Sequence, residues 1–338
     1  MRWWPVRIAT WAGILLLAVA PWLEAEDDWQ SGSVDYRVPA GDENVPEPFR
    51  LPDHQFPYRM RRIAHQVQSA EVYDVTFPSP VAGDVEENNT VHCEYFLPVR
   101  GESSCPAVVV LHILGGDFPL SRLFALTFAE RGVAALFVKM PYYGPRRPPG
   151  SPRRMISPDP DQTVAGMTQA VLDIRRAVAW LESQPRVDPD RLGIFGISLG
   201  GITGALAAEC EPRLYNICLV LAGGDIAKVA WESRELAEVR RACEARGITM
   251  QQFMERMRVI DPVTYAANLQ GRRILMLNAA QDEVIPRACT ESLWEAMGKP
   301  PIHWYNGGHY SVARFLPHAM ARTAEFFEQS AKRPAQTR

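Results

Sequence analysis

The chain has 338 residues, a formal net charge of −3 and 47% hydrophobic residues, as expected for a globular protein with a substantial core. No basic stripe with interleaved aromatic residues is present, which excludes a nucleic-acid surface. The length alone allows two domains, but the order of the elements described below predicts one large domain with an insertion.

Residues 1–25 have the form of a signal peptide. A start with two arginines precedes an uncharged apolar run over residues 8–23, which is short for a membrane span of about 20 residues. Ala25 is a small residue suited to precede a cut, whereas Ala18-Val19-Ala20 is less suitable because a proline follows it. An uncleaved anchor is the alternative. We expect the rest of the chain to be exported to the periplasm or the extracellular space, with no stable membrane insertion after cleavage.

Residues 26–70 are rich in Pro, Asp and Glu and show little periodicity. We therefore expect an extended arm that lies on the main domain, with a helix only over residues 58–69. The main domain is predicted over residues 71–330. Residues 331–338 form a C-terminal tail.

Strands and helices alternate along most of the main domain. Residues 71–77 and 90–97 alternate in polarity like half-buried antiparallel strands, and the apolar run 107–112 is typical of a buried parallel strand. Further strands are expected at 134–138, 192–195, 217–221, 273–277 and 302–305, and helices at 120–131, 162–182, 201–208, 286–297 and 312–329. A helical insertion occupies about 226–269. This order predicts a mostly parallel sheet with helices on both faces and ligands at the carboxyl ends of its strands.

The segment Gly196-Ile197-Ser198-Leu199-Gly200 has the G-x-S-x-G pattern of a nucleophile elbow. A buried strand precedes it and a helix rich in small residues follows, which is the context that this motif requires. The glycines leave room for a sharp turn that presents the Ser198 Oγ, and the following helix favours negative charge beside it. The alternative is an ordinary turn.

Two later loops complete a resemblance to the α/β-hydrolases. The chain is similar in layout to their dienelactone-hydrolase and acetyl-xylan-esterase-like branch over residues 70–330, and the fold implied is an α/β-hydrolase fold with a small helical lid. The resemblance implies the order serine, acid, histidine. Residues 278–286 match the acid loop, with Asp282 as the acid, and residues 306–310 match the histidine loop, with His309 as the base.

The acid has two rivals, Glu283 beside it and Asp225 after the strand at 217–221, because some relatives take their acid from that earlier position. His309 follows two glycines at the end of a strand, whereas His303 and His112 are expected to be structural.

The oxyanion hole is expected to use the N–H of Leu199 and one from residues 112–116. The family usually has glycine directly after the histidine of that loop, but this chain has Ile113. Leu114 is the preferred second donor, and Ile113 is the next choice.

Two further segments lie near the predicted site. Tyr142 or Tyr143 is expected to contact substrate, with aromatic packing at a turn as the alternative. Apolar residues of the insertion are expected to form a lid, or else simply to pack in the core: Trp231, Met250, Phe253, Met254 and Met257.

The chain has six cysteines, an even number, and is expected to be exported, so it could form one to three disulfides. Buried free thiols are the alternative. No C-x-x-C motif or His/Cys cluster predicts a metal site.

These features predict an exported serine hydrolase that cleaves a carboxylic ester of a small molecule, carbohydrate or lipid through an acyl-enzyme, without a metal or cofactor. A peptidase or an acyltransferase of the same fold would use the same three residues. A non-catalytic binding protein of this fold is the alternative from another class.

Overall fold

The computed structural model describes residues 29–334 except 64–67, 102 and 117. The signal peptide expected at residues 1–25 lies outside this part of the chain. Within it, no helix is both long enough and apolar enough to cross a membrane.

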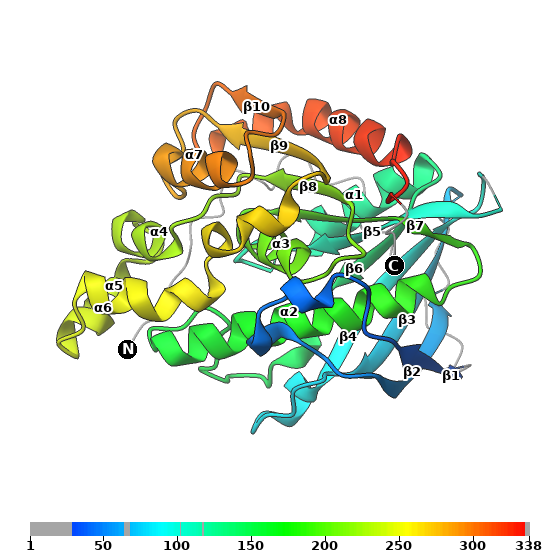
Figure 1. Cartoon of the computed structure of the whole chain (residues 1–338), viewed down its shortest axis with the longest axis horizontal. Coiled ribbons are helices and arrows are strands. Elements are labelled where there is room, and N and C mark those ends of the chain that lie inside the picture. Colours follow the sequence, from blue (N-terminus) through cyan, green and yellow to red (C-terminus); the bar gives the residue numbers. More distant parts are fainter. Residues whose placement is uncertain (1–28, 64–67, 102, 117, 335–338) are drawn as a thin grey trace.

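One sheet of ten strands organises the described part of the chain (Figure 1). The strands lie in the order β1-β2-β3-β4-β6-β5-β7-β8-β9-β10. Their bounds are β1 Gln30–Tyr36, β2 His54–Ile63, β3 Ala70–Pro78, β4 Thr90–Pro98, β5 Cys105–Leu111, β6 Ala134–Val138, β7 Val187–Ile197, β8 Asn216–Val220, β9 Arg273–Ala279 and β10 Ile302–Tyr305. Strands β1 to β4 pair antiparallel, β4 pairs antiparallel with β6, and every later pair is parallel. The mostly parallel sheet predicted for the main domain is therefore confirmed.

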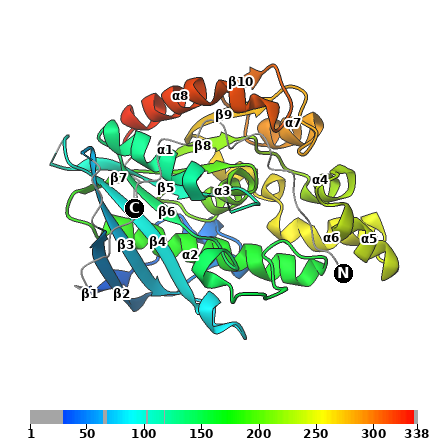
Figure 2. The same ribbon diagram turned by 180° about the vertical axis from the view of Figure 1, so that it is seen from behind.

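Helices cover both faces of this sheet (Figures 1 and 2). Their bounds are α1 Phe118–Glu130, α2 Pro160–Glu182, α3 Leu199–Glu209, α4 Ile226–Glu232, α5 Ala237–Ala245, α6 Met250–Met257, α7 Arg287–Ala296 and α8 Leu316–Glu328. Successive residues of the central strand β7 point to opposite faces. Ile194 belongs to the core cluster that contains Trp180 of α2 and Leu206 of α3. Phe195 belongs to the cluster on the other face, where its ring packs on Phe128 of α1, which in turn packs on Phe327 of α8. The site at the end of β7 therefore rests on a strand that is buried from both sides.

The N-terminal arm differs from its prediction. The helix expected over residues 58–69 is wrong, because residues 54–63 form β2, which pairs with β1 on one side and β3 on the other. The arm thus extends the sheet through β1 and β2 instead of lying over the domain without regular structure. Pairing with two neighbouring strands provides partners for the backbone N–H and C=O groups of this segment. The local sequence pattern does not reveal such pairing.

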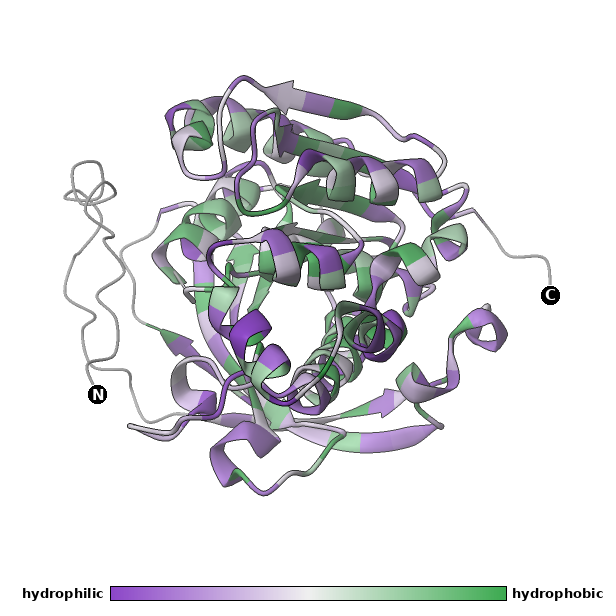
Figure 3. Cartoon of the chain, turned by 90° about the vertical axis from the view of Figure 1, so that its left-hand side faces the viewer, coloured by the Kyte–Doolittle hydropathy of each residue, from purple (hydrophilic) through white to green (hydrophobic). Residues whose placement is uncertain are grey.

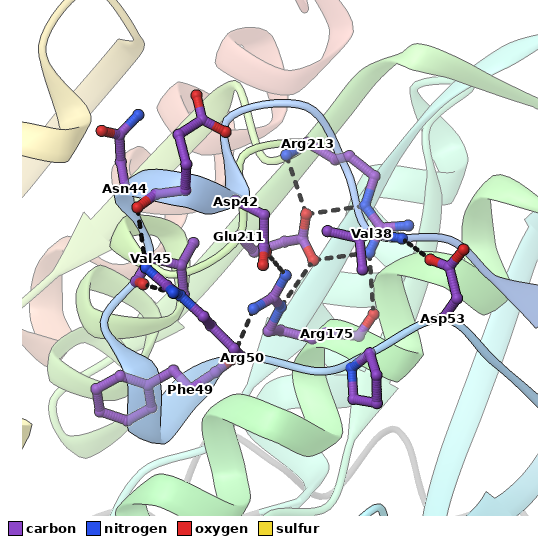
Figure 4. A network of polar contacts seen from close by, with 12 residues as sticks. Val38, Asp42, Asn44, Val45, Phe49, Arg50, Asp53, Arg175, Glu211 and Arg213 are labelled. Atoms are coloured by element: carbon purple, nitrogen blue, oxygen red, sulfur yellow. Dashed lines mark hydrogen bonds and ion pairs between the residues drawn. The ribbon is translucent and has the colours of Figure 1, made fainter.

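A buried ion network ties the arm to the main domain (Figure 4). Arg175 of α2 contacts Asp42 of the arm, donates to the Phe49 carbonyl at 2.6 Å and lies 3.5 Å from Glu211. Arg213 bonds the same Glu211 at 2.7 Å. The Arg175 and Glu211 side chains are completely buried, so each charge depends on the others to offset its lost hydration.

The insertion predicted at about 226–269 contains α4, α5 and α6, followed by short 3₁₀ turns. These helices lie at one end of the molecule, beyond α3 (Figure 1). Figure 3 looks at this end and shows both hydrophobic and hydrophilic residues on the helices that face the viewer. Phe253 and Val239 are buried, whereas Met254 is half exposed, so the insertion packs one apolar side inward.

All six cysteines are buried free thiols: Cys93, Cys105, Cys210, Cys218, Cys243 and Cys289. The sequence allowed disulfides or free thiols, and the structure has free thiols. In the described part of the chain, no group of three or more His, Cys, Asp or Glu side chains is arranged to hold a metal ion.

Candidate active site

Ser198 lies at the sharp turn between β7 and α3, with a left-handed backbone of φ 55° and ψ −117°. The flanking glycines permit this turn because they have no side chains, so other backbone segments can pass close to them. A Cβ on Gly196 would lie 2.0 Å from the Gly200 oxygen, and a Cβ on Gly200 would lie 2.7 Å from the His112 oxygen. Since real side chains do not fit at these distances, the backbone holds Ser198 in a strained and well-defined position.

The structure brings together the three side chains predicted to act as serine, histidine and acid. The Ser198 Oγ lies 3.1 Å from the His309 Nε2, and the His309 Nδ1 lies 2.9 Å from one oxygen of Asp282 and 3.0 Å from the other. The Asp282 side chain is 2% exposed and that of His309 is 9% exposed. Contacts at these distances, shielded from water, suit proton transfer from the serine to the imidazole.

Local backbone groups hold the Asp282 carboxylate in place. Its Oδ1 accepts the N–H of Val284 at 2.9 Å and that of Ile285 at 2.8 Å. Glu283 turns away from the imidazole and accepts the backbone N–H of His309 at 2.8 Å. The carboxylate next to Asp282 thus supports the histidine loop and not the imidazole ring.

Asp225 occupies a different place. It precedes α4, and its backbone N–H donates to Asp261 at 3.1 Å. Within the described residues, His309 Nδ1 contacts Asp282 and neither of the two rival acids.

The two predicted oxyanion donors lie near this cluster. Leu199 is the first residue of α3, so its backbone N–H has no partner within the helix. Leu114 lines the pocket that also contains Ser198. The peptide group between Ile113 and Leu114 is anchored by its carbonyl, which accepts from the His112 Nδ1 at 2.9 Å and from the Gly116 N–H at 2.9 Å.

His112 is structural in this arrangement. It is fully buried, and its Nε2 accepts the Met140 N–H at 3.1 Å, so its Nδ1 carries the proton that it donates to Ile113. Burial lowers the pKa of His112 to about 4, so the ring is neutral at pH 7.

A pocket opens beside Ser198, with an empty volume of about 740 Å³ that includes its opening to solvent. Most of its lining is apolar and comes from α2, the insertion and the acid loop: Met167, Val229, Leu236, Val239, Phe253, Met257, Val284 and Ile285. Phe253 and Met257 belong to the predicted lid set, whereas Trp231 packs behind Phe253 at a ring distance of 5.5 Å.

Tyr142 and Tyr143 are not among the residues that line this pocket. Both rings pack against the hydrophobic core, and Tyr143 contacts the His112 ring at 4.4 Å between centroids. The Tyr142 N–H donates to Asn88, and its φ of 65° marks a tight turn. The structure therefore supports aromatic packing at a turn, and substrate contact by either tyrosine stays a prediction.

Sequence reasoning missed a polar group at the pocket. Glu235, in the connection between α4 and α5, lines the pocket together with Ser198. Tyr310 follows His309 and contacts its ring at 5.4 Å. Burial and a hydrogen bond with Glu235 raise the pKa of the Tyr310 hydroxyl. A glutamate on an insertion gives no sequence signal, because only the folded chain brings it to the histidine loop.

The parallel sheet, the elbow after β7 and the loops after β9 and β10 define an α/β-hydrolase. A family model confirms this class: the chain belongs to the family described as alpha/beta hydrolase domain containing 18, whose model matches residues 43–229. The model of the prolyl oligopeptidase family also matches, over residues 167–333. These two matches support a hydrolase.

Sequence relatives cover only part of the chain. An uncharacterized protein of Mycobacterium tuberculosis (strain CDC 1551 / Oshkosh) is 31% identical over 234 residues, which are 66% of this chain and 54% of the relative. The chain therefore spans about half the length of this curated relative. A thiohydrolase of Arthrinium phaeospermum is 33% identical over 121 residues, which are 34% of each chain.

Solved structures share the fold at lower identity. Acetyl xylan esterase 1 from Thermoanaerobacterium sp. JW/SL YS485 matches with a TM-score of 0.64 and 20% identity, and the match covers 80% of this chain and 87% of that one. At this identity the likeness shows the fold alone.

Proposed function

We propose that this hydrolase is an exported serine esterase that cleaves a carboxylic ester through an acyl-enzyme. The observation that carries the proposal is the continuous contact from the Ser198 Oγ through the His309 imidazole to the buried Asp282 carboxylate. The name of one sequence relative, a thiohydrolase, supports a reaction at an acyl carbonyl.

In the proposed first step, His309 Nε2 accepts the Ser198 proton as Oγ attacks the ester carbonyl. The imidazolium then keeps its Nδ1–H bond to Asp282, whose negative charge stabilises it. His309 next gives its proton to the leaving alcohol oxygen, which leaves the acyl group on Ser198. Water then attacks the acyl carbonyl while His309 takes its proton, and His309 gives that proton to the Ser198 Oγ as the acyl–Oγ bond breaks and the acid product leaves.

The negative charge on the carbonyl oxygen needs two donors, for which we propose Leu199 and Leu114. In a planar trans peptide the C=O and N–H groups point in opposite directions. Because the Ile113 carbonyl is held by His112 and Gly116, the Leu114 N–H is directed away from those two groups and stays available to the oxyanion.

The apolar pocket supports an uncharged acyl chain as the group that lies beside Ser198. Its lining from Leu236, Val239 and Phe253 offers apolar contact but few hydrogen-bond partners for a sugar or peptide backbone. We therefore expect preference for acyl chains longer than acetyl.

The test is hydrolysis of 4-nitrophenyl esters from acetate to octanoate, with Ser198→Ala and His309→Ala as controls. Each variant is expected to lose several orders of magnitude in turnover while keeping its thermal stability, because such residues act as a unit. A fluorophosphonate should label Ser198. An adduct on another serine, or equal labelling of Ser198→Ala, would contradict the mechanism.

The match to the prolyl oligopeptidase family makes a peptidase the second candidate. Cleavage of peptide 4-nitroanilides faster than of the ester series would favour it. An acyltransferase would transfer the acyl group to an added alcohol in preference to water. A non-catalytic binding protein would hydrolyse neither the esters nor the peptide 4-nitroanilides.

Export is proposed from the basic start and the apolar run of residues 8–23. Protein recovered outside the cytoplasm should have an N-terminus near Glu26. An intact Met1 in the soluble cytoplasmic fraction would contradict export.

A further inference from the structure

Two arginines converge on one backbone oxygen in the loop that leads from β6 to α2. The Arg147 Nε donates to the Ser151 carbonyl at 3.2 Å, and the Arg154 Nη1 donates to the same carbonyl at 2.8 Å. Arg154 also donates to the Arg153 carbonyl at 2.9 Å. We call Arg147 and Arg154 the arginine pair. Backbone carbonyls thus hold two like charges close together.

Among the residues that the structure describes, the arginine pair lacks the acidic partners that its neighbours have. Arg146 lies 2.8 Å from Asp173, and Arg153 lies 2.6 Å from Asp84. No carboxylate of the described residues lies within ion-pair distance of Arg147 or Arg154. Both side chains are half-buried.

The pKa of Arg154 reflects the closeness of the two positive charges. Burial and the nearby charge of Arg147 lower the pKa of Arg154. Two guanidinium groups that repel each other, with no carboxylate from the described part of the chain between them, form an arrangement that an incoming oxyanion would stabilise.

The arginine pair lies beside the proposed oxyanion loop. Both of its charges act on the Tyr143 hydroxyl, and the Tyr143 ring packs on His112 at 4.4 Å. A Cβ on Gly116 would lie 3.0 Å from the same ring. Farther along the same loop, Ile156 lines the pocket that contains Ser198. An anion at the arginine pair therefore lies on the side of the site formed by these loops.

The pocket indicates which part of an ester would carry that anion. Its lining is mostly apolar, and Glu235 adds a carboxylate that repels negative charge. An anionic acyl chain is therefore disfavoured there, which leaves the alcohol part of the substrate for the arginine pair.

We infer that Arg147 and Arg154 form an anion-binding subsite for a carboxylate or phosphate on the alcohol part of an ester whose uncharged acyl chain enters the pocket. This inference rests on the proposed ester hydrolysis, and it names the substrate class of the same site.

The test uses three butanoate esters of phenols that differ only in the meta substituent, which is a carboxamide, a carboxylate or a phosphate. Enzymatic kcat/KM values are divided by the rates of alkaline hydrolysis, which corrects for leaving-group differences. The parent protein is expected to prefer at least one anionic ester by about tenfold, because charge-assisted bonds to arginine are strong. The carboxylate and phosphate esters show which oxyanion is preferred.

Arg147→Gln and Arg154→Gln should each reduce this preference severalfold and leave the neutral ester within about twofold, and the preference should fall as salt is added. Arg153→Gln is the matched control, because this arginine lies in the same loop but is paired with Asp84. It should leave the preference unchanged. Equal losses on neutral and anionic esters would overturn the inference, as would a parent protein with no anionic preference.

Binding gives a readout that does not depend on turnover. Ser198→Ala is titrated with 3-(butanoylamino)benzoate and with its neutral benzamide counterpart. Tighter binding of the benzoate that is lost in Ser198→Ala/Arg147→Gln/Arg154→Gln supports the subsite even if the esters are not hydrolysed. Equal binding of the benzoate and the benzamide would overturn the subsite even if the esters are hydrolysed.

Discussion

Replacing Asp282 by asparagine tests the acid without changing the shape of the site. In the parent protein, Oδ1 of Asp282 accepts two backbone N–H groups, from Val284 at 2.9 Å and Ile285 at 2.8 Å. His309 Nδ1 lies 2.9 Å from the other oxygen, Oδ2, and 3.0 Å from Oδ1 itself. An asparagine keeps its single oxygen on the two N–H groups, because the reversed orientation would leave both unsatisfied at about 1–3 kcal/mol each.

The amide nitrogen then takes the position 2.9 Å from His309 Nδ1 and can only donate, which favours Nδ1 as the acceptor and the ring proton on Nε2, while the amide oxygen at 3.0 Å is the one acceptor left for an Nδ1–H. In that tautomer the imidazole cannot accept the proton of Ser198 at 3.1 Å. The wrong tautomer costs about 10⁴-fold in kcat in a comparable triad. This loss corresponds to about 5.5 kcal/mol at 1.36 kcal/mol per tenfold change.

The assay is kcat on 4-nitrophenyl butanoate for Asp282→Asn, Glu283→Gln and Asp225→Asn at matched thermal stability. Glu283→Gln should stay within about tenfold of the parent, because its amide oxygen still accepts the His309 N–H. Turnover within about tenfold of the parent in Asp282→Asn would refute the tautomer argument. A collapse in Asp225→Asn alone would move the acid to the loop after β8.

Three further predictions concern the arm, a buried acid and the pocket. Asp42→Asn weakens the buried contact with Arg175 and should lower the free energy of unfolding in urea by about 1–3 kcal/mol, whereas Arg37→Gln, in an exposed pair, should leave the urea midpoint unchanged. The Glu209 carboxyl has no hydrogen-bond partner among the described residues, and burial raises its pKa well above the usual value, so the contribution of this group to stability should fall as pH rises above about 4.5. Glu209→Gln should flatten that fall in a plot of Tm against pH, and equal slopes would contradict the argument. Val239→Trp fills the apolar pocket and should cut kcat/KM on 4-nitrophenyl octanoate by about tenfold, while the value for 4-nitrophenyl acetate stays within about threefold. An unchanged dependence on acyl-chain length would show that acyl chains bind elsewhere.

Several parts of the fold and the candidate site could be predicted because their causes are local. The glycines around Ser198 allow only a sharp turn, and the neighbouring apolar strand and small-residue helix specify what the turn connects. Asp282 and His309 follow the ends of two later strands. Parallel strands bring such loops to one edge of the sheet, so the order along the chain was enough to predict that they meet.

The strand β2 was missed for the opposite reason. Local periodicity over residues 58–69 resembled a helix, but β1 and β3 supply hydrogen bonds from both sides of that segment. Strand pairing depends on residues distant in sequence, so it outweighs weak local preferences.

The sequence by itself determined the fold class and the candidate nucleophile, base and acid, because backbone sterics and strand order act over short stretches or through fixed topology. Only the tertiary structure decided that Tyr143 packs on His112 and that Glu235 reaches the pocket. It also decided that Arg147 and Arg154 share one carbonyl. These features depend on side chains that meet across separate loops, and no local pattern specifies such contacts.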